Sequence, residues 1–166
     1  CGKHFPGQGS AFGDTHEGIT DISKTWNIAD LQPYSELNQS GDLDMVMVAH
    51  VFNKKMDHKF PASLSKDIIN NVFRKNLGFR GVVMCDDPSM KAISDNYNLE
   101  QTFELMLNAG IDLFCLGNNL RYDKNYISKS VLALSNLVET NKISENRIYE
   151  SIYRVNVLKD KFNINK

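Results

Sequence analysis

The sequence predicts an α/β fold built from about four consecutive βα units, which is half of a (β/α)8 barrel of the TIM type. Two observations support this prediction. Four short apolar runs recur along the chain, and their starts lie about 30–40 residues apart, as βα units require. Helical patterns with their own start and stop signals lie between these runs. A small open α/β sheet is the alternative, and in both architectures ligands bind at the carboxyl ends of the strands.

The four apolar runs are predicted to be parallel strands. The second and third, D-M-V-M-V-A-H at 44–50 and G-V-V-M-C at 81–85, are nearly continuous rather than alternating, which is the pattern of strands buried on both faces. The runs are Cys1–Phe5, Asp44–Val51, Gly81–Cys85 and Ile111–Leu116.

Helix signals separate the strands. A short helix is predicted over Pro33–Leu37, before the second run. Ser65 is a favourable N-cap for a helix that Gly78 ends. Asn98 opens a further helix, which ends at Gly110.

Two longer helices are expected after the last strand, over residues 125–139 and from Ser144 onward. The second carries Ile148, Ile152, Val155 and Leu158 at helical spacing, and we expect this stripe to face the core.

Length and composition are those of one globular domain, which we place over residues 1–166. The chain has 42% hydrophobic and 23% charged residues, a balance close to that of globular proteins, which argues against disorder. Its net charge of −1 predicts neither nucleic acid nor an anionic membrane as a partner. The apolar runs are far shorter than a membrane span. Neither a phosphate-binding glycine motif nor zinc-ligand spacing is present, so no cofactor and no metal are expected.

The cysteines and the start of the chain bear on its cellular context. Cys1, Cys85 and Cys115 have no C-x-x-C spacing, which favours reduced thiols. No signal peptide is visible, and a cytoplasmic location is favoured. Because the chain lacks an initiator methionine and enters a motif almost at once, we expect it to be part of a longer protein.

A glycine-rich segment at residues 3–16, with the sequence K-H-F-P-G-Q-G-S-A-F-G-D-T-H, is the most informative feature. Lys3 and His4 lie at the end of the first run, and the loop then delivers Asp14 and His16 two residues apart. A carboxylate and an imidazole at this spacing can meet through a hydrogen bond, which orients the ring and raises its basicity. Such a histidine can transfer protons in both directions near neutral pH.

Further polar side chains follow the other strands. Asp86 ends a buried strand, which would aim its carboxylate, while Asp87 fits a supporting or capping role. His50 is evenly balanced between a substrate contact and a buried core histidine, and we place it with the substrate-binding residues. Asn118 fits a capping role better than a sugar contact. Lys3 has an alternative role as a Schiff-base lysine.

These motifs resemble glycoside hydrolase family 3, specifically its bacterial β-N-acetylglucosaminidases. The family pattern K-H-F-P-G-H-G-D-T-x-x-D-S-H matches residues 3–16 at the same length, with Gln8 in place of the usual histidine and a different stretch at residues 10–13. Later signatures are V-A-H-V at 48–51, P-A-S-L-S at 61–65, L-G-F-R-G-V-V at 77–83 and D-D-P-S-M-K-A at 86–92. The resemblance implies that the chain is the C-terminal half of the family's catalytic barrel.

The resemblance also implies an activity and a role for each residue. The intact enzyme would be a retaining glycosidase that removes terminal β-linked N-acetylglucosamine from peptidoglycan- or chitin-derived saccharides. Asp86 would be the nucleophile, and Asp14 with His16 would supply the acid and base. Lys3 and His4 would hold sugar hydroxyls.

Other functions stay open at this stage. The same site suits a β-glucosidase or a glycoside phosphorylase, Lys3 suits a Schiff-base lyase, and the chain fits a noncatalytic half-barrel. A half-barrel has open strand edges, so we expect the chain alone to be nearly inactive. Another chain or a second copy would then complete the barrel.

Overall fold

A computed structural model describes residues 1–9, 11–120 and 122–164 of the chain. Its main sheet has four parallel strands in the order β1-β3-β5-β6. These strands are β1 (Gly2–Phe5), β3 (Met45–Val48), β5 (Val82–Cys85) and β6 (Leu113–Phe114), and a second, two-stranded sheet pairs β2 (Thr20–Asp21) with β4 (Val51–Phe52). The order in the main sheet follows the order in the chain without reversal, as in a barrel, whereas a doubly wound sheet reverses at a switch point.

Each predicted strand is present, although it is shorter than its apolar run. The run Asp44–Val51 divides into β3 and the start of β4, because the chain leaves the main sheet at Ala49 and His50 to pair with β2. Buried side chains come from both faces of β5, including adjacent Val82 and Val83, as expected for a strand covered on both sides.

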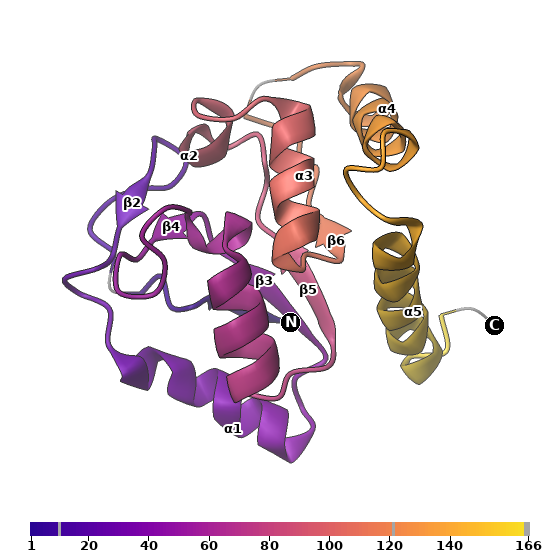
Figure 1. Ribbon diagram of the computed structural model, residues 1–166. Helices are drawn as coiled ribbons and strands as arrows, with labels where there is room; N and C mark the ends of the chain where they lie inside the picture. Colours follow the sequence, from indigo (N-terminus) through magenta and orange to yellow (C-terminus); the bar gives the residue numbers. More distant parts are fainter. Residues whose placement is uncertain (10, 121, 165–166) are drawn as a thin grey trace.

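Helices follow the strands as predicted. They are α1 (Gln32–Ser40), the π-helical η3 (Asp67–Asn76), α2 (Lys91–Ser94), α3 (Leu99–Ala109), α4 (Tyr126–Glu139) and α5 (Glu145–Lys161), with short 3-10 turns at η1 (Ile28–Leu31) and η2 (Ala62–Leu64). In Figure 1, α4 and α5 lie on one side of the molecule, beyond β6, and α1 lies on the other. In the described part of the chain, no helix has both the length and the apolar character needed to cross a bilayer.

The residues predicted to begin and end helices make the expected capping contacts. The Ser65 hydroxyl accepts a hydrogen bond from the Ile68 amide at 3.0 Å, one turn into the predicted helix. The Asn98 side chain accepts one from the Gln101 amide at 2.9 Å. Gly110 ends α3 with a φ of 112°, a conformation that glycine adopts without a side-chain clash.

An aromatic cluster fixes β1 against the helices. The Phe5 ring lies 4.4 Å from the Phe73 ring and 5.1 Å from the Tyr34 ring, and Phe73 stacks on Phe79 at 4.4 Å between centroids. Burial of each such ring contributes about 1.5–3 kcal/mol. The end of β1, which carries Lys3 and His4, is therefore supported by a rigid core.

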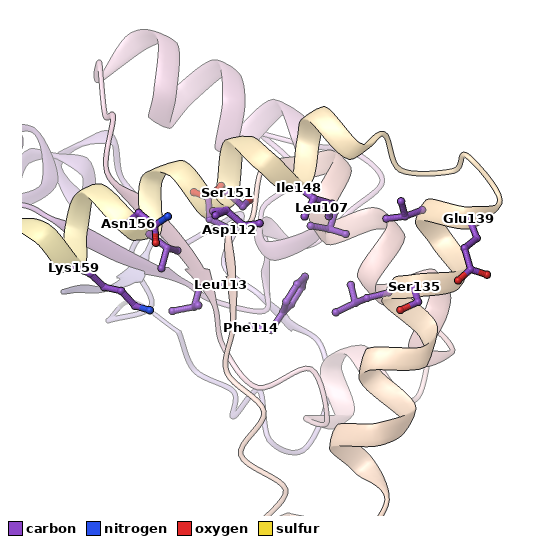
Figure 2. A pocket seen from close by; sticks show the side chains of 14 residues that line it. Leu107, Asp112, Leu113, Phe114, Ser135, Glu139, Ile148, Ser151, Asn156 and Lys159 are labelled. Carbon is purple, nitrogen blue, oxygen red and sulfur yellow. Dashed lines mark hydrogen bonds between the residues drawn. The ribbon is translucent and has the colours of Figure 1, made fainter. Parts of the chain in front are cut away.

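The apolar stripe of α5 does not enter a closed core, contrary to expectation. Ile152 is 48% exposed, and it lines an apolar groove of about 690 Å³ between β6, α4 and α5. Figure 2 shows side chains from these three elements around the groove, Leu113 and Phe114 of β6 among them. In the described sheet, β6 pairs with β5 alone, so its other edge is open. The apolar side of α5 therefore has no further strand beside β6 to pack against.

A buried carboxylate at the amino end of β6 joins α5 to the sheet. The Asp112 side chain is fully buried, and its oxygens accept hydrogen bonds from Arg74 at 2.7 Å, Arg154 at 2.8 Å and Ser151 at 2.8 Å. A third guanidinium, that of Arg147, lies 3.4 Å away. Burial lowers the pKa of Arg74 to about 10, although the negative charge of Asp112 acts to raise it. The Arg74 guanidinium therefore stays charged at neutral pH.

Candidate active site

The candidate site lies at the carboxyl edge of the main sheet, where Asp86 follows β5. The Asp86 amide donates to the Val48 carbonyl at 3.1 Å and so extends the strand ladder by one bond. One carboxylate oxygen, Oδ1, accepts from the Asp87 amide at 2.9 Å, and Oδ2 lies 4.0 Å from Nε2 of His4. The Asp86 side chain is 20% exposed, so it is held by the sheet yet open to a ligand.

Lys3 and His4 lie on the first strand of the same sheet. Both line a cavity of about 550 Å³ together with Gly7, Gln8 and Asp30. Lys3 is exposed, and the His4 side chain is one-third exposed. The structure thus brings an imidazole close to Asp86 and places Lys3 in the wall of the neighbouring cavity.

Asp14 and His16 form a pair in the glycine loop. His16 Nδ1 lies 2.6 Å from Asp14 Oδ1, and the His16 backbone amide donates to the same oxygen at 2.8 Å. The hydrogen bond from the His16 backbone amide, and to a smaller extent the one from the His16 ring, lowers the pKa of Asp14. The carboxylate is therefore ionised and accepts the Nδ1 proton, which leaves Nε2 of His16 as the nitrogen that can exchange a proton with a substrate.

Two side-chain hydrogen bonds anchor the loop, in which Gly9, Phe12 and Gly13 are exposed. Trp26 donates from its indole to the Pro6 carbonyl at 2.8 Å, and the side-chain Nε2 of Gln8 donates to the Thr15 hydroxyl at 3.3 Å. Ser10 lies outside the described residues. The anchoring role of Trp26 has no signal in the sequence, because it depends on a contact between segments twenty residues apart.

The two pairs remain separate in this structure. Across residues 1–9, 11–120 and 122–164, no hydrogen bond or ion pair joins Asp14 or His16 to Asp86. The predicted nucleophile, Asp86, lies beside His4, whereas the predicted acid and base, His16 and Asp14, contact one another.

His50 is placed differently from the other predicted site residues. Its side chain is fully buried, and its ring nitrogens contact the Ser63 hydroxyl at 2.7 Å and the Asp87 carbonyl at 3.0 Å. Burial lowers the pKa of His50, although the charges of Asp86 and Asp87 oppose this. His50 does not line the cavity of Lys3 and His4, so the structure supports its interpretation as a buried, hydrogen-bonded histidine.

Two further polar residues have structural roles. Asp87 is nearly buried, and its Oδ1 accepts from the Ser89 amide at 2.9 Å, which fits the predicted supporting carboxylate. Asn118 bonds the backbone of Asp123 twice, at 2.9 and 3.0 Å, and so closes the loop after β6 as the predicted capping role requires.

Comparison with known proteins identifies the family. Residues 1–158 match the family described as Glycosyl hydrolase family 3 N terminal domain. The chain belongs to glycoside hydrolase family 3. Among its relatives, Beta-hexosaminidase A of Pseudoalteromonas piscicida is 30% identical over 96% of this chain and 29% of its own length. Beta-hexosaminidase of Psychromonas ingrahamii is 34% identical over 97% of this chain and 45% of its own.

Solved structures of similar proteins agree in fold. A family 3 β-N-acetylglucosaminidase from Paenibacillus sp. str. FPU-7 superposes with a TM-score of 0.87 at 32% identity, over 99% of this chain and 31% of that chain. The β-N-acetylglucosaminidase from Thermotoga maritima gives a TM-score of 0.79 at 33% identity, over 94% and 33%. The predicted family and the (β/α)8 barrel type are confirmed, and the chain spans less than half of the length of each of these four proteins.

Membership of family 3 does not by itself test the roles of single residues. The roles assigned to Asp86, Asp14, His16, Lys3 and His4 remain predictions, which the geometry above now makes specific.

Proposed function

We propose that this chain is part of a retaining β-N-acetylhexosaminidase, which removes terminal β-linked N-acetylglucosamine from peptidoglycan- or chitin-derived saccharides. The observation that carries the proposal is the placement of Asp86, a partly exposed carboxylate aimed by a buried strand and flanked by His4. Relatives named beta-hexosaminidase and structures named β-N-acetylglucosaminidase support the choice of sugar.

The residues suit a two-step reaction. Asp86 attacks the anomeric carbon, and the bond to the leaving oxygen breaks as His16 donates its Nε2 proton to that oxygen. In the second step His16 takes a proton from water, which attacks the anomeric carbon and releases Asp86. Asp14 stays ionised throughout and stabilises the charged imidazolium form of His16.

We further propose that the remainder of the barrel closes the sheet at its two open edges, those of β1 and β6. The apolar groove beside β6 supports this, since closure would cover it. The other half lies either on the same polypeptide or on another chain, which includes a second copy. The mass of the native enzyme distinguishes these arrangements.

The proposal is tested by trapping the covalent intermediate in the full-length enzyme. A 2-fluoro glycoside slows breakdown of the glycosyl-enzyme, so mass spectrometry of peptides from inactivated enzyme should find the sugar on Asp86. A label on Asp87 or Asp14 would contradict the assignment. Turnover that requires inorganic phosphate and yields a sugar phosphate would instead establish a phosphorylase.

His16→Ala should lose more activity on substrates with poor leaving groups than on those with good ones. Loss of a general acid costs about 10²–10⁴-fold, but a nitrophenolate leaves without being protonated and should escape much of this loss. The measurement is kcat/KM for nitrophenyl and for alkyl or disaccharide β-N-acetylglucosaminides. His58→Ala, in an exposed loop, is the matched control. Equal losses on both substrate classes would exclude His16 as the acid.

A further inference from the structure

His50 connects the site to the core through two hydrogen bonds of different character. Its Nε2 lies 3.0 Å from the backbone carbonyl oxygen of Asp87, and its Nδ1 lies 2.7 Å from Oγ of Ser63. Both partners are buried, and the His50 ring has no exposed surface. No solvent therefore competes for either nitrogen.

The identity of these partners determines the tautomer of the ring. A carbonyl oxygen can only accept a hydrogen bond, so Nε2 of His50 must carry a proton and donate it to Asp87. The neutral ring then has its lone pair on Nδ1, and the Ser63 hydroxyl, which can donate, supplies the proton for that contact. The Asp87 carbonyl thus selects the Nε2–H form, and the Ser63 hydroxyl rotates to donate to Nδ1.

The Asp87 residue that His50 holds is fixed from other directions as well. Its Oδ1 accepts from the Ser89 amide at 2.9 Å. Its Oδ2 lies against Gly117, where an added Cβ would approach it to 2.5 Å. With its carbonyl and carboxylate both held, Asp87 has little freedom to turn, and its own amide is directed at Oδ1 of Asp86 at 2.9 Å.

We infer that His50 is a positioning residue for the nucleophile: its Nε2–H holds the Asp87 carbonyl, and Asp87 in turn holds the carboxylate of Asp86 through its amide. The inference rests on the proposed function for the role of Asp86. It assigns His50 to the chemical step and not to sugar binding, since both ring nitrogens are already used by the protein.

The test compares His50→Met with His50→Gln in the full-length enzyme. Methionine fills a similar volume without an N–H group, whereas glutamine keeps an amide donor at about the reach of Nε2. For His50→Met we expect kcat and the rate of inactivation by the 2-fluoro glycoside to fall on the order of 10²-fold, the cost of a small misplacement of a reacting group, with KM nearly unchanged. His50→Gln should recover part of both rates, and His58→Gln should match the wild type.

Two further measurements keep the inference testable if His50→Met does not fold. Ser63→Ala leaves the His50 donor to Asp87 in place but removes the hydrogen bond to Nδ1 that helps to orient the ring, so it should show a smaller loss in the same two rates. In wild-type enzyme labelled with ¹⁵N-histidine, the His50 signals, assigned by their loss in His50→Gln, should report the neutral Nε2–H tautomer at pH 7.

The outcomes separate this inference from the proposed function. An Nδ1–H tautomer, or a raised KM with unchanged kcat and inactivation rate, would overturn the positioning role. Wild-type enzyme without activity on N-acetylglucosaminides would overturn the proposed function, while the tautomer measurement would still test the contact on which the inference depends.

Discussion

Asp86→Ala is expected to reduce kcat on a β-N-acetylglucosaminide by on the order of 10⁴-fold or more, the scale on which loss of a group essential to covalent catalysis is felt. The alanine leaves no carboxylate to form the bond to the anomeric carbon. The neighbouring Asp87 does not replace it, because Asp87 is nearly buried and its Oδ1 accepts a hydrogen bond from the Ser89 amide. The measurement is steady-state hydrolysis of a nitrophenyl substrate by the full-length enzyme.

Azide should partly restore the reaction of this variant. The small anion fits the space left by the side chain and attacks the anomeric carbon from the face that Asp86 used, so the product should be an α-glycosyl azide. Asp95→Ala, which removes an exposed carboxylate after α2, is the control and should retain wild-type activity. An Asp86→Ala enzyme with more than a hundredth of wild-type turnover would rule out Asp86 as the nucleophile.

Asp112→Asn is expected to give the largest loss of stability, lowering the free energy of unfolding by about 3–5 kcal/mol. The substitution keeps the shape of the side chain but removes the negative charge that faces Arg74, Arg147 and Arg154 in a buried position. Three guanidiniums would then repel one another with little access to water. Urea unfolding of the full-length enzyme, followed by circular dichroism, measures the change.

A surface ion pair provides the matched control. Asp123→Asn removes the partner of Lys129, whose ammonium lies 2.6 Å from the Asp123 carboxylate. Both side chains are well exposed, at 58% for Lys129 and 34% for Asp123. Such a pair contributes about 1 kcal/mol or less. Equal losses for the two variants would show that the Asp112 cluster does not hold α5 to the sheet.

Much of this protein is determined locally and could be predicted from the sequence. The strands lie within continuous apolar runs, and helices begin at Asn98 or Ser144 because a side chain there bonds the first free amides. The residue types at the strand ends, Asp86 above all, identify the edge that carries the site, because side chains there project beyond the hydrogen-bonded sheet.

The tertiary structure alone decided which of these side chains meet. His50 follows β3 as Asp86 follows β5, yet His50 is fully buried whereas Asp86 reaches solvent. The difference depends on the packing of η2, which brings Ser63 against the His50 ring. The partners of Asp112 come from η3 and α5, far apart in the chain, and the stripe of α5 stays half-exposed because β6 has an open edge. Local patterns specify the elements, whereas contacts between distant segments depend on strand register and on what covers each face.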